Sequence, residues 1–282
     1  MNTAILPDEI ELASSKPSSR RGRWGRVATR VLVMGAVVLV AEGLTRRASS
    51  PFFPPPFKVW AWARESWFDG PAWRLWIGRD LVDTVKPSLQ RLGTAYVLAV
   101  TGSIVIGSLI CASMAVRSFT YPLVHFLRSI PSAAAVPMWI VVFGIGDTAK
   151  VWVITLAVGL TLVVSVVDGI TAVDKALLDT ARIYHIGPWT RQWAILLPGA
   201  LPRIFAGLRV TTAIALVAMI LAELNGASDG IGFFIIYAQR NFQIRQMWAA
   251  IILVGIIGTL MNVLLTLVER RALTWHQSQR RT

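Results

Sequence analysis

A charged segment at residues 174–191 holds the side chains best placed for chemistry in this chain. A helix that begins at Lys175 would carry Lys175, Asp179 and Arg182 at positions i, i+4 and i+7, on one face. Asp174 precedes it with a side chain that suits an N-cap. No Ser/His/Asp set, metal motif or cofactor motif accompanies this face. The segment therefore predicts contact with a surface rather than catalysis.

A Gly-Pro pair divides this segment in two. Gly187 suits the C′ position after the first helix, and Pro188 suits the first position of a second one. We expect the second helix to end before Pro198, and Pro202 to mark the start of the next long helix. The pattern predicts a rigid elbow of two short helices with its bend at Gly187.

The surface that this elbow contacts stays open at this point. An amphipathic helix can lie on lipid headgroups, and it can equally press on another protein. Leu177, Ala181 and Tyr184 form a second, less polar face of the first helix. The residue types alone do not separate the two alternatives.

The composition indicates a protein that spans a membrane several times. Hydrophobic residues make up 55% of the 282 residues, charged residues only 15%, and the mean hydropathy is +0.59. Soluble domains have about 25% charged residues. Five windows lack Asp, Glu, Lys and Arg: Leu92–Val116, Ser129–Gly146, Val151–Val167, Val210–Ala222 and Met247–Val268. With the apolar run at 31–44, they predict an all-α protein with six transmembrane helices.

Two prolines fall inside the third predicted helix, at Pro131 and Pro137. Proline removes a backbone hydrogen bond, which lipid tolerates only where neighbouring protein satisfies the freed carbonyl. We expect a distorted middle in this helix. It either lines a translocation path or is a packing kink.

Three carboxylates, Glu42, Asp168 and Glu223, lie near the ends of predicted membrane helices. An acid inside a membrane is a candidate functional group, and a proton-coupled carrier would use one. Because all three lie at the margins rather than at mid-membrane, capping or interfacial ion pairs are the favoured interpretation. Glu223 remains a candidate for the translocation pathway.

The net charge of +13 does not indicate nucleic-acid binding, since the basic residues are scattered through loops and tails. A cluster of arginines precedes the first apolar run, so the positive-inside rule places both termini in the cytoplasm. Residues 1–30 read as a disordered basic tail and residues 272–282 as a C-terminal tail. An uncleaved first helix is favoured over a signal peptide.

Five tryptophans lie within residues 58–86, after a proline-rich linker. Indole rings favour the membrane interface, so we expect an interfacial helix there. The second predicted helix, about residues 88–116, is rich in small residues and should pack inside the bundle. Cys111 has no partner for a disulfide, and the three histidines lack the spacing of metal ligands.

The elbow resembles the ATPase-docking loop, or EAA loop, of bacterial ABC importer permeases. Asp179-Thr180-Ala181 stands at the acidic-Ala-Ala triplet of that loop, and Ile195-Leu196-Leu197-Pro198 matches its ending. His185 stands where the family has glycine. Either the break has moved to Gly187, or His185 adopts a left-handed conformation, which is costlier than for glycine.

Two further segments extend the resemblance over roughly residues 50–275. Residues 129–146 are similar to the third helix of nitrate, taurine and aliphatic-sulfonate permeases, and residues 222–232 to the end of their fifth helix. The resemblance implies a type I permease architecture, with residues 31–271 as the permease domain and 174–203 as the coupling loop. Its ATPase-coupling residues would be Asp179, Thr180, Ala181, Tyr184, His185, Gly187, Ile195, Leu197 and Pro198.

The resemblance also implies the partners. They are a second copy of the chain, a cytoplasmic ABC ATPase dimer that binds ATP and magnesium, and an extracytoplasmic binding protein that delivers a small anion. The chain would lie in the lipid of a bacterial cytoplasmic membrane as a non-catalytic subunit, and it has no Gly-Lys pair from which to build a Walker A motif. A secondary transporter driven by an ion gradient is the alternative.

Overall fold

The computed structural model describes residues 20–70 and 78–273, and these divide into two compact units. The first unit ends at Phe57 and contains helix α1 (Arg20–Ala48). Glu42 of α1 pairs with Arg46 at 2.6 Å and also accepts the backbone N–H of Phe57 at 3.0 Å. This confirms an ion pair for Glu42. Because α1 begins at Arg20, residues 20–30 are helical rather than part of a disordered tail.

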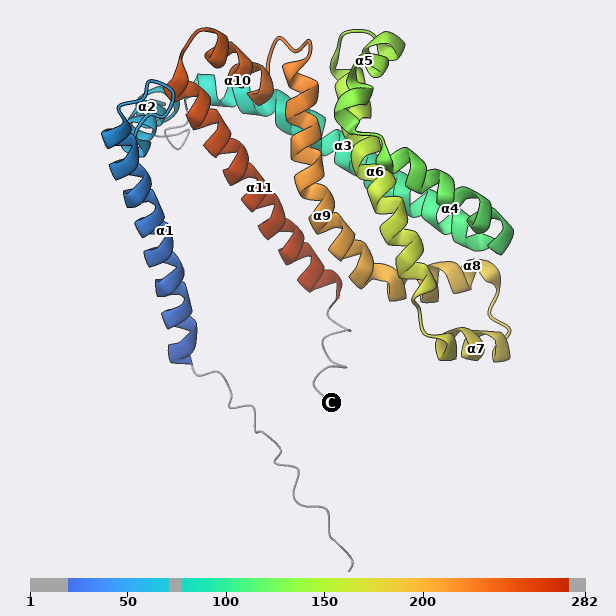
Figure 1. Cartoon of the computed structure of the whole chain (residues 1–282). Coiled ribbons are helices and arrows are strands. Elements are labelled where there is room, and N and C mark those ends of the chain that lie inside the picture. Colours follow the sequence, from blue (N-terminus) through green and yellow to red (C-terminus); the bar gives the residue numbers. More distant parts are fainter. Residues whose placement is uncertain (1–19, 71–77, 274–282) are drawn as a thin grey trace, which may run out of the picture. The chain divides into compact units, whose positions relative to one another are not determined.

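The second unit is a bundle of helices (Figure 1). The long helices are α3 (Arg79–Ala112), α6 (Asp147–Thr171), α9 (Leu197–Leu224) and α11 (Ile244–Ala272). Shorter ones are α2 (Pro56–Trp67), α4 (Met114–Ser129), α5 (Ser132–Phe143), α7 (Lys175–Ile183), α8 (Pro188–Arg191) and α10 (Ile231–Arg240). A π-helical turn, η2 (Gln192–Leu196), joins α8 to α9.

Helix α6 lies between α3 and α9 and forms the centre of the bundle (Figure 1). Its side chains Ile154, Val158 and Leu162 are fully buried. The approach to α3 depends on Gly107, where an added Cβ would lie 2.6 Å from a methyl group of Val166. Small residues allow helices to approach this closely, as predicted for the second membrane helix.

The two ends of the bundle differ. Helices α7 and α8 lie at one end, here called the loop end (Figure 1). The start of α6, the end of α9 and α10 lie at the other, here called the network end (Figure 1). Helices α6 and α9 therefore connect the two ends directly.

The predicted number of membrane spans is not confirmed. Within the described ranges, four stretches are long and apolar enough to cross a membrane: Arg79–Ala112, Asp147–Thr171, Pro188–Leu224 and Ile244–Ala272. Helices α4 and α5 make a fifth if they form one span. The expected distortion near Pro131 is larger than predicted, because the chain bends there by 102°.

The tryptophan-rich segment begins as predicted with a helix, α2, which buries Trp67 in the core. Trp60 on the same helix is exposed. Trp73 and Trp76 lie outside the described residues, as do residues 1–19 and 274–282 of the predicted tails.

Candidate functional site

The loop end carries the elbow that the sequence predicts. Helix α7 begins at Lys175, and the Asp174 carboxylate accepts the N–H of Ala176 at 2.9 Å, so the N-cap is confirmed. Asp179 and Arg182 form an ion pair at 3.0 Å on the exposed face. The first helix of the elbow therefore forms as its local sequence dictates.

The bend of the elbow falls at His185 and not at Gly187. His185 has φ 51°, in the left-handed region, whereas Gly187 has φ −59° and ψ 154°. The N–H of Ile186 donates to the Ala181 carbonyl at 2.9 Å, and that of His185 donates to Arg182 at 3.0 Å. This is a Schellman motif with histidine at C′. The prediction of a bend at Gly187 is wrong, and the alternative with a left-handed His185 is confirmed.

The second half of the elbow is longer than predicted. Pro188 is at the first position of α8, as expected, but the helix does not end before Pro198. The π-helical turn over Gln192–Leu196 carries it without interruption into α9. Pro198 lies in the first turn of α9 and Pro202 inside it. A displacement of α8 would therefore be transmitted along α9.

Large apolar side chains are exposed on the elbow. Ile183 is 74% exposed, Tyr184 75% and Trp189 74%, whereas Ala181 is buried against the bundle. Clusters of exposed aromatic and aliphatic side chains mark contact sites for protein or lipid. The elbow has one face that fixes it to the bundle and one that is free for a partner.

Close contacts join α4, α6 and α9 to one another beside the elbow. An added Cβ at Gly169 would lie 3.0 Å from the Ala200 Cβ, so α6 and α9 nearly touch here. The hydroxyl of Tyr121 donates to the Asp168 carboxylate at 2.7 Å, which ties α4 to the end of α6. Arg203 donates to the Asp168 backbone carbonyl at 3.2 Å. Within the described residues, the Asp168 carboxylate thus accepts a tyrosine hydroxyl and does not form the expected cap or ion pair.

The network end contains a cluster of charges around the buried Arg91 of α3. Its guanidinium contacts three carboxylates: Glu223 at 2.9 Å, Asp147 at 2.7 Å and Asp229. Glu223 also accepts the Ser88 hydroxyl at 2.8 Å and the Gly232 N–H at 2.8 Å. Arg91 and Glu223 are 3% and 0% exposed. This network joins α3, α6, α9 and the turn before α10.

Glu223 therefore forms a buried ion pair, which agrees with the favoured interpretation of that carboxylate. Its role in a translocation pathway stays a prediction. Sequence analysis did not identify Arg91, which immediately precedes the charge-free window from Leu92. An arginine at the edge of the charge-free window, with an acid at a helix end elsewhere, was the available signal.

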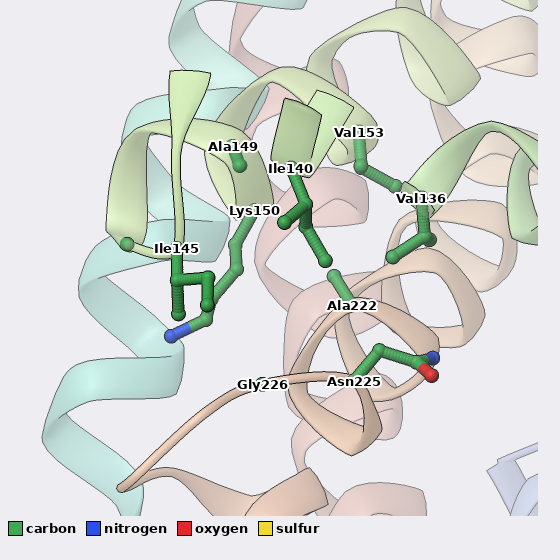
Figure 2. A pocket seen from close by; sticks show the side chains of 10 residues that line it. Val136, Ile140, Ile145, Ala149, Lys150, Val153, Ala222, Asn225 and Gly226 are labelled. Carbon is green, nitrogen blue, oxygen red and sulfur yellow. The ribbon is translucent and has the colours of Figure 1, made fainter. Parts of the chain in front are cut away.

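A narrow pocket lies beside this network (Figure 2). Figure 2 shows Ile140 of α5 directed toward Ala222 of α9, with Ile145 and Lys150 at one side. Its volume is about 10 Å³, room for a single water-sized sphere. This pocket between α5, α6 and α9 is therefore too small to hold an organic solute.

A much larger cavity of about 750 Å³ opens beside the break between α4 and α5. Pro131, at the break, lines it, and Val153 of α6 lines both this cavity and the narrow pocket. Pro137 lies inside α5. That Pro131 and Pro137 belong to a translocation pathway stays a prediction.

A membrane-spanning bundle with a broken helix, a large open cavity and a projecting elbow defines a multi-pass protein of the transport class. Residues 99–274 match the family described as binding-protein-dependent transport system inner membrane component. The chain belongs to this family. Its resemblance to ABC importer permeases is thereby confirmed.

Individual relatives agree with this assignment. The chain is 32% identical over 203 residues to a probable ABC transporter permease protein of Brucella abortus, covering 72% of this chain and 81% of that protein. It is 28% identical to the putative aliphatic sulfonates transport permease protein SsuC of Bacillus subtilis (95% of this chain and 94% of that protein). It is 29% identical to the taurine transport system permease protein TauC of Escherichia coli (94% and 98%).

A solved structure shows the same fold. The chain aligns with a chain of the MetNI methionine ABC transporter in an inward-facing conformation with a TM-score of 0.59 and 18% identity. The alignment covers 68% of this chain and 95% of that one. The all-α permease architecture is therefore confirmed.

Proposed function

We propose that this chain is the membrane subunit of an ABC importer and that its elbow couples transport to a separate ATPase. The observation that carries the proposal is the rigid elbow at 174–191, which exposes Ile183, Tyr184 and Trp189 to a partner. In this proposal the elbow and both termini lie in the cytoplasm. ATP and magnesium bind to the partner ATPase.

The contacts around the elbow suggest how its movement reaches the membrane helices. Its second helix continues into α9, and Gly169 of α6 lies against Ala200 of α9. Tyr121 adds α4 to this junction through its hydrogen bond to Asp168. A movement of the elbow would therefore displace α4, α6 and α9 together, and these helices line the large cavity. Such rigid-body coupling fits an importer that alternates between two openings.

The proposed substrate is a small anion of the sulfonate, taurine or nitrate type. Relatives named for aliphatic sulfonates and for taurine span nearly the whole chain, and one named for nitrate import is 28% identical over 187 residues. A binding protein outside the membrane would deliver the substrate to the network end. The transporter would contain two copies of the chain, in keeping with the resemblance stated above. No observation favours the alternative of an ion-gradient carrier.

Affinity purification of the full chain from its native membrane tests this proposal. A Walker A protein with ATPase activity should co-purify with it. Trp189→Ala and Tyr184→Ala should each reduce the co-purified ATPase by about tenfold, since buried aromatic side chains dominate the energy of protein contacts. Asp179→Ala should uncouple transport from hydrolysis.

The matched control is Trp60→Ala, which changes an exposed tryptophan of α2. It should leave the amount of co-purified ATPase unchanged. Normal association and transport in all three elbow variants, with normal amounts of protein in the membrane, would refute the coupling role.

A further inference from the structure

Arg128 is a charged residue at the middle depth of the bundle. It lies in the last turn of α4, just before the break at Pro131, and it lines the large cavity. The same cavity is lined by Leu156 and Thr161 of α6, which runs from 147 to 171, and by Val210 of α9, which runs from 197 to 224. These residues lie near the centre of their helices. Arg128 is therefore far from both ends of the bundle.

The interactions of Arg128 differ from those of Arg91 and Arg209, which lie within α3 and α9. Arg91 pairs with three carboxylates, and Arg209 pairs with Glu269 at 2.5 Å. Within residues 20–70 and 78–273, no hydrogen bond or ion pair engages the Arg128 guanidinium. An arginine at this depth costs several kcal/mol unless a counter-ion or water solvates it, and such residues mark substrate pathways. The side chain has the charge and the free donors to take an anion.

The cavity around Arg128 has the character of a ligand site. Its volume of about 750 Å³ lies within the usual range of small-molecule pockets, about 300–1,000 Å³. Ser132, the first residue of α5, lines it beside Arg128, so the positive end of this helix faces the cavity. The remaining walls are mainly apolar, for example Met138, Leu156 and Ile214. One polar corner and several apolar walls suit a molecule with a charged head and a hydrocarbon tail.

The cavity lining also indicates which anions fit. No Asp or Glu is among its described lining residues, so an ammonium group would have no partner there. A bare inorganic anion would pair with Arg128 but gain nothing from the apolar walls. The lining therefore favours an organic monoanion without an amine.

We infer that the Arg128 cavity binds the anionic head of an alkanesulfonate-type solute in transit, with its tail against Met138, Leu156 and Ile214. This inference rests on the proposed function, because it assigns the cavity to the transported solute. It predicts that the membrane subunit itself contributes to selection among sulfonates, taurine and nitrate. Arg128 is the specificity-determining residue in this account.

Direct binding to the full-length chain tests the inference without the ATPase. The chain is reconstituted in nanodiscs of zwitterionic lipid, and binding of radiolabelled 1-butanesulfonate is measured by equilibrium dialysis. Competition with unlabelled 1-butanesulfonate, taurine, nitrate and 1-butanol gives the order of affinities. Butanesulfonate should compete best, with taurine, nitrate and butanol each about tenfold weaker or more.

Four variants separate the charge from the fold. Arg128→Gln should weaken butanesulfonate binding by about tenfold or more, because it removes a charge-assisted contact, and Arg128→Lys should weaken it less. Ile214→Trp, which narrows the cavity and keeps Arg128, should also weaken binding. Arg117→Gln removes an exposed arginine from the same helix and should bind as the unaltered chain does. Thermal unfolding of each variant verifies the fold.

Three outcomes would overturn the inference. One is unchanged binding in both Arg128→Gln and Ile214→Trp. Another is that added phosphatidylglycerol abolishes butanesulfonate binding and that the cavity shows no preference among the soluble anions. The cavity would then be a binding site for lipid. The third is a change in oligomeric state in Arg128→Gln without a change in binding, which would assign Arg128 to a contact between copies.

The purification experiment above keeps the two proposals separable. If the ATPase co-purifies but Arg128 does not affect anion binding, only the cavity assignment fails. If butanesulfonate binding depends on Arg128 but no ATPase is found, the coupling role fails instead.

Discussion

The two ends of the bundle each contain an arginine–carboxylate pair of nearly the same length in opposite surroundings. Arg91 and Glu223 meet at 2.9 Å with 3% and 0% of their side chains exposed, whereas Arg182 and Asp179 meet at 3.0 Å with 71% and 64% exposed. Water screens the second pair and not the first. The distance between the charged groups alone therefore says little about what an ion pair contributes to the stability of the fold.

The comparison shows how each end obtains its geometry. At the network end, side chains determine the arrangement, because Glu223 is held by Arg91, by Ser88 and by the N–H of Gly232. At the loop end, local hydrogen bonds determine it: the Asp174 carboxylate caps α7, and the backbone closes a Schellman motif at His185. This difference leaves the side chains of the elbow free for a partner, while those of the network are fully engaged.

The largest predicted effect comes from removing one partner of the buried pair. Arg91→Met leaves the Glu223 carboxylate buried without its counter-charge, and we expect a loss of about 3–5 kcal/mol in stability. Arg182→Met in the elbow is the matched control and should cost about 0–1 kcal/mol. Thermal unfolding of the two purified variants measures the difference. Equal losses would refute the contrast between the two ends.

A second prediction concerns the close packing around Glu223. An added Cβ at Gly232 would lie 2.6 Å from the Glu223 Cβ and 2.9 Å from the Ile220 carbonyl oxygen. Gly232→Ala should therefore cost about 1–3 kcal/mol through overpacking. Gly102→Ala on α3, where nothing lies within 4 Å, should be neutral or slightly stabilising. A neutral Gly232→Ala would show that the start of α10 shifts more easily than the close contacts with Glu223 imply.

A third prediction tests the bend of the elbow. A left-handed residue costs a non-glycine side chain about 1–2 kcal/mol, so His185→Gly should stabilise the bend by roughly 1 kcal/mol and His185→Val should weaken it. The exchange rate of the Ile186 amide, which donates to Ala181, reports this locally. Gly187→Ala should have little effect, because Gly187 has an ordinary φ and open space around it. If Gly187→Ala weakened the bend and the His185 variants had little effect, the bend would lie at Gly187 instead.

The smallest predicted effect is at the junction of the elbow with α4. Tyr121→Phe removes the hydroxyl that donates to Asp168 and should cost about 0.5–1.5 kcal/mol. In the proposed mechanism it should also lower the amount of substrate transported per ATP hydrolysed. Ser118→Ala, on the exposed side of α4, serves as the control. If Tyr121→Phe transported as much substrate per ATP hydrolysed as the unaltered chain, α4 would not transmit the movement of the elbow to the cavity.

Local features of this fold could be predicted from the sequence, and features that depend on tertiary contacts could not. The Asp174 cap, the start of α7 at Lys175 and Pro188 at the start of α8 follow from residue types at fixed positions. The bend at His185 was assigned to the wrong residue, because glycine is the usual choice at C′ and Gly187 lies only two residues away. The π-helical turn that joins the elbow to α9 leaves no local signal.

Arg91 and Arg128 were missed for a related reason. Arg91 and Arg128 each stand just before a window without charges, where a charge looks like the edge of a membrane helix. Only the three-dimensional arrangement shows that Arg91 meets acids from α6, α9 and the following turn. Likewise, only the break at Pro131 places Arg128 beside the large cavity.

Hydrogen exchange of the full chain, measured by mass spectrometry with and without its ATPase subunit, tests the central claim most directly. The account predicts that the ATPase slows exchange in residues 175–191 and leaves the turn at residues 225–230 unchanged, because the proposed contact is made by Ile183, Tyr184 and Trp189 at the other end of the bundle. Protection of that turn with none at the elbow would contradict it.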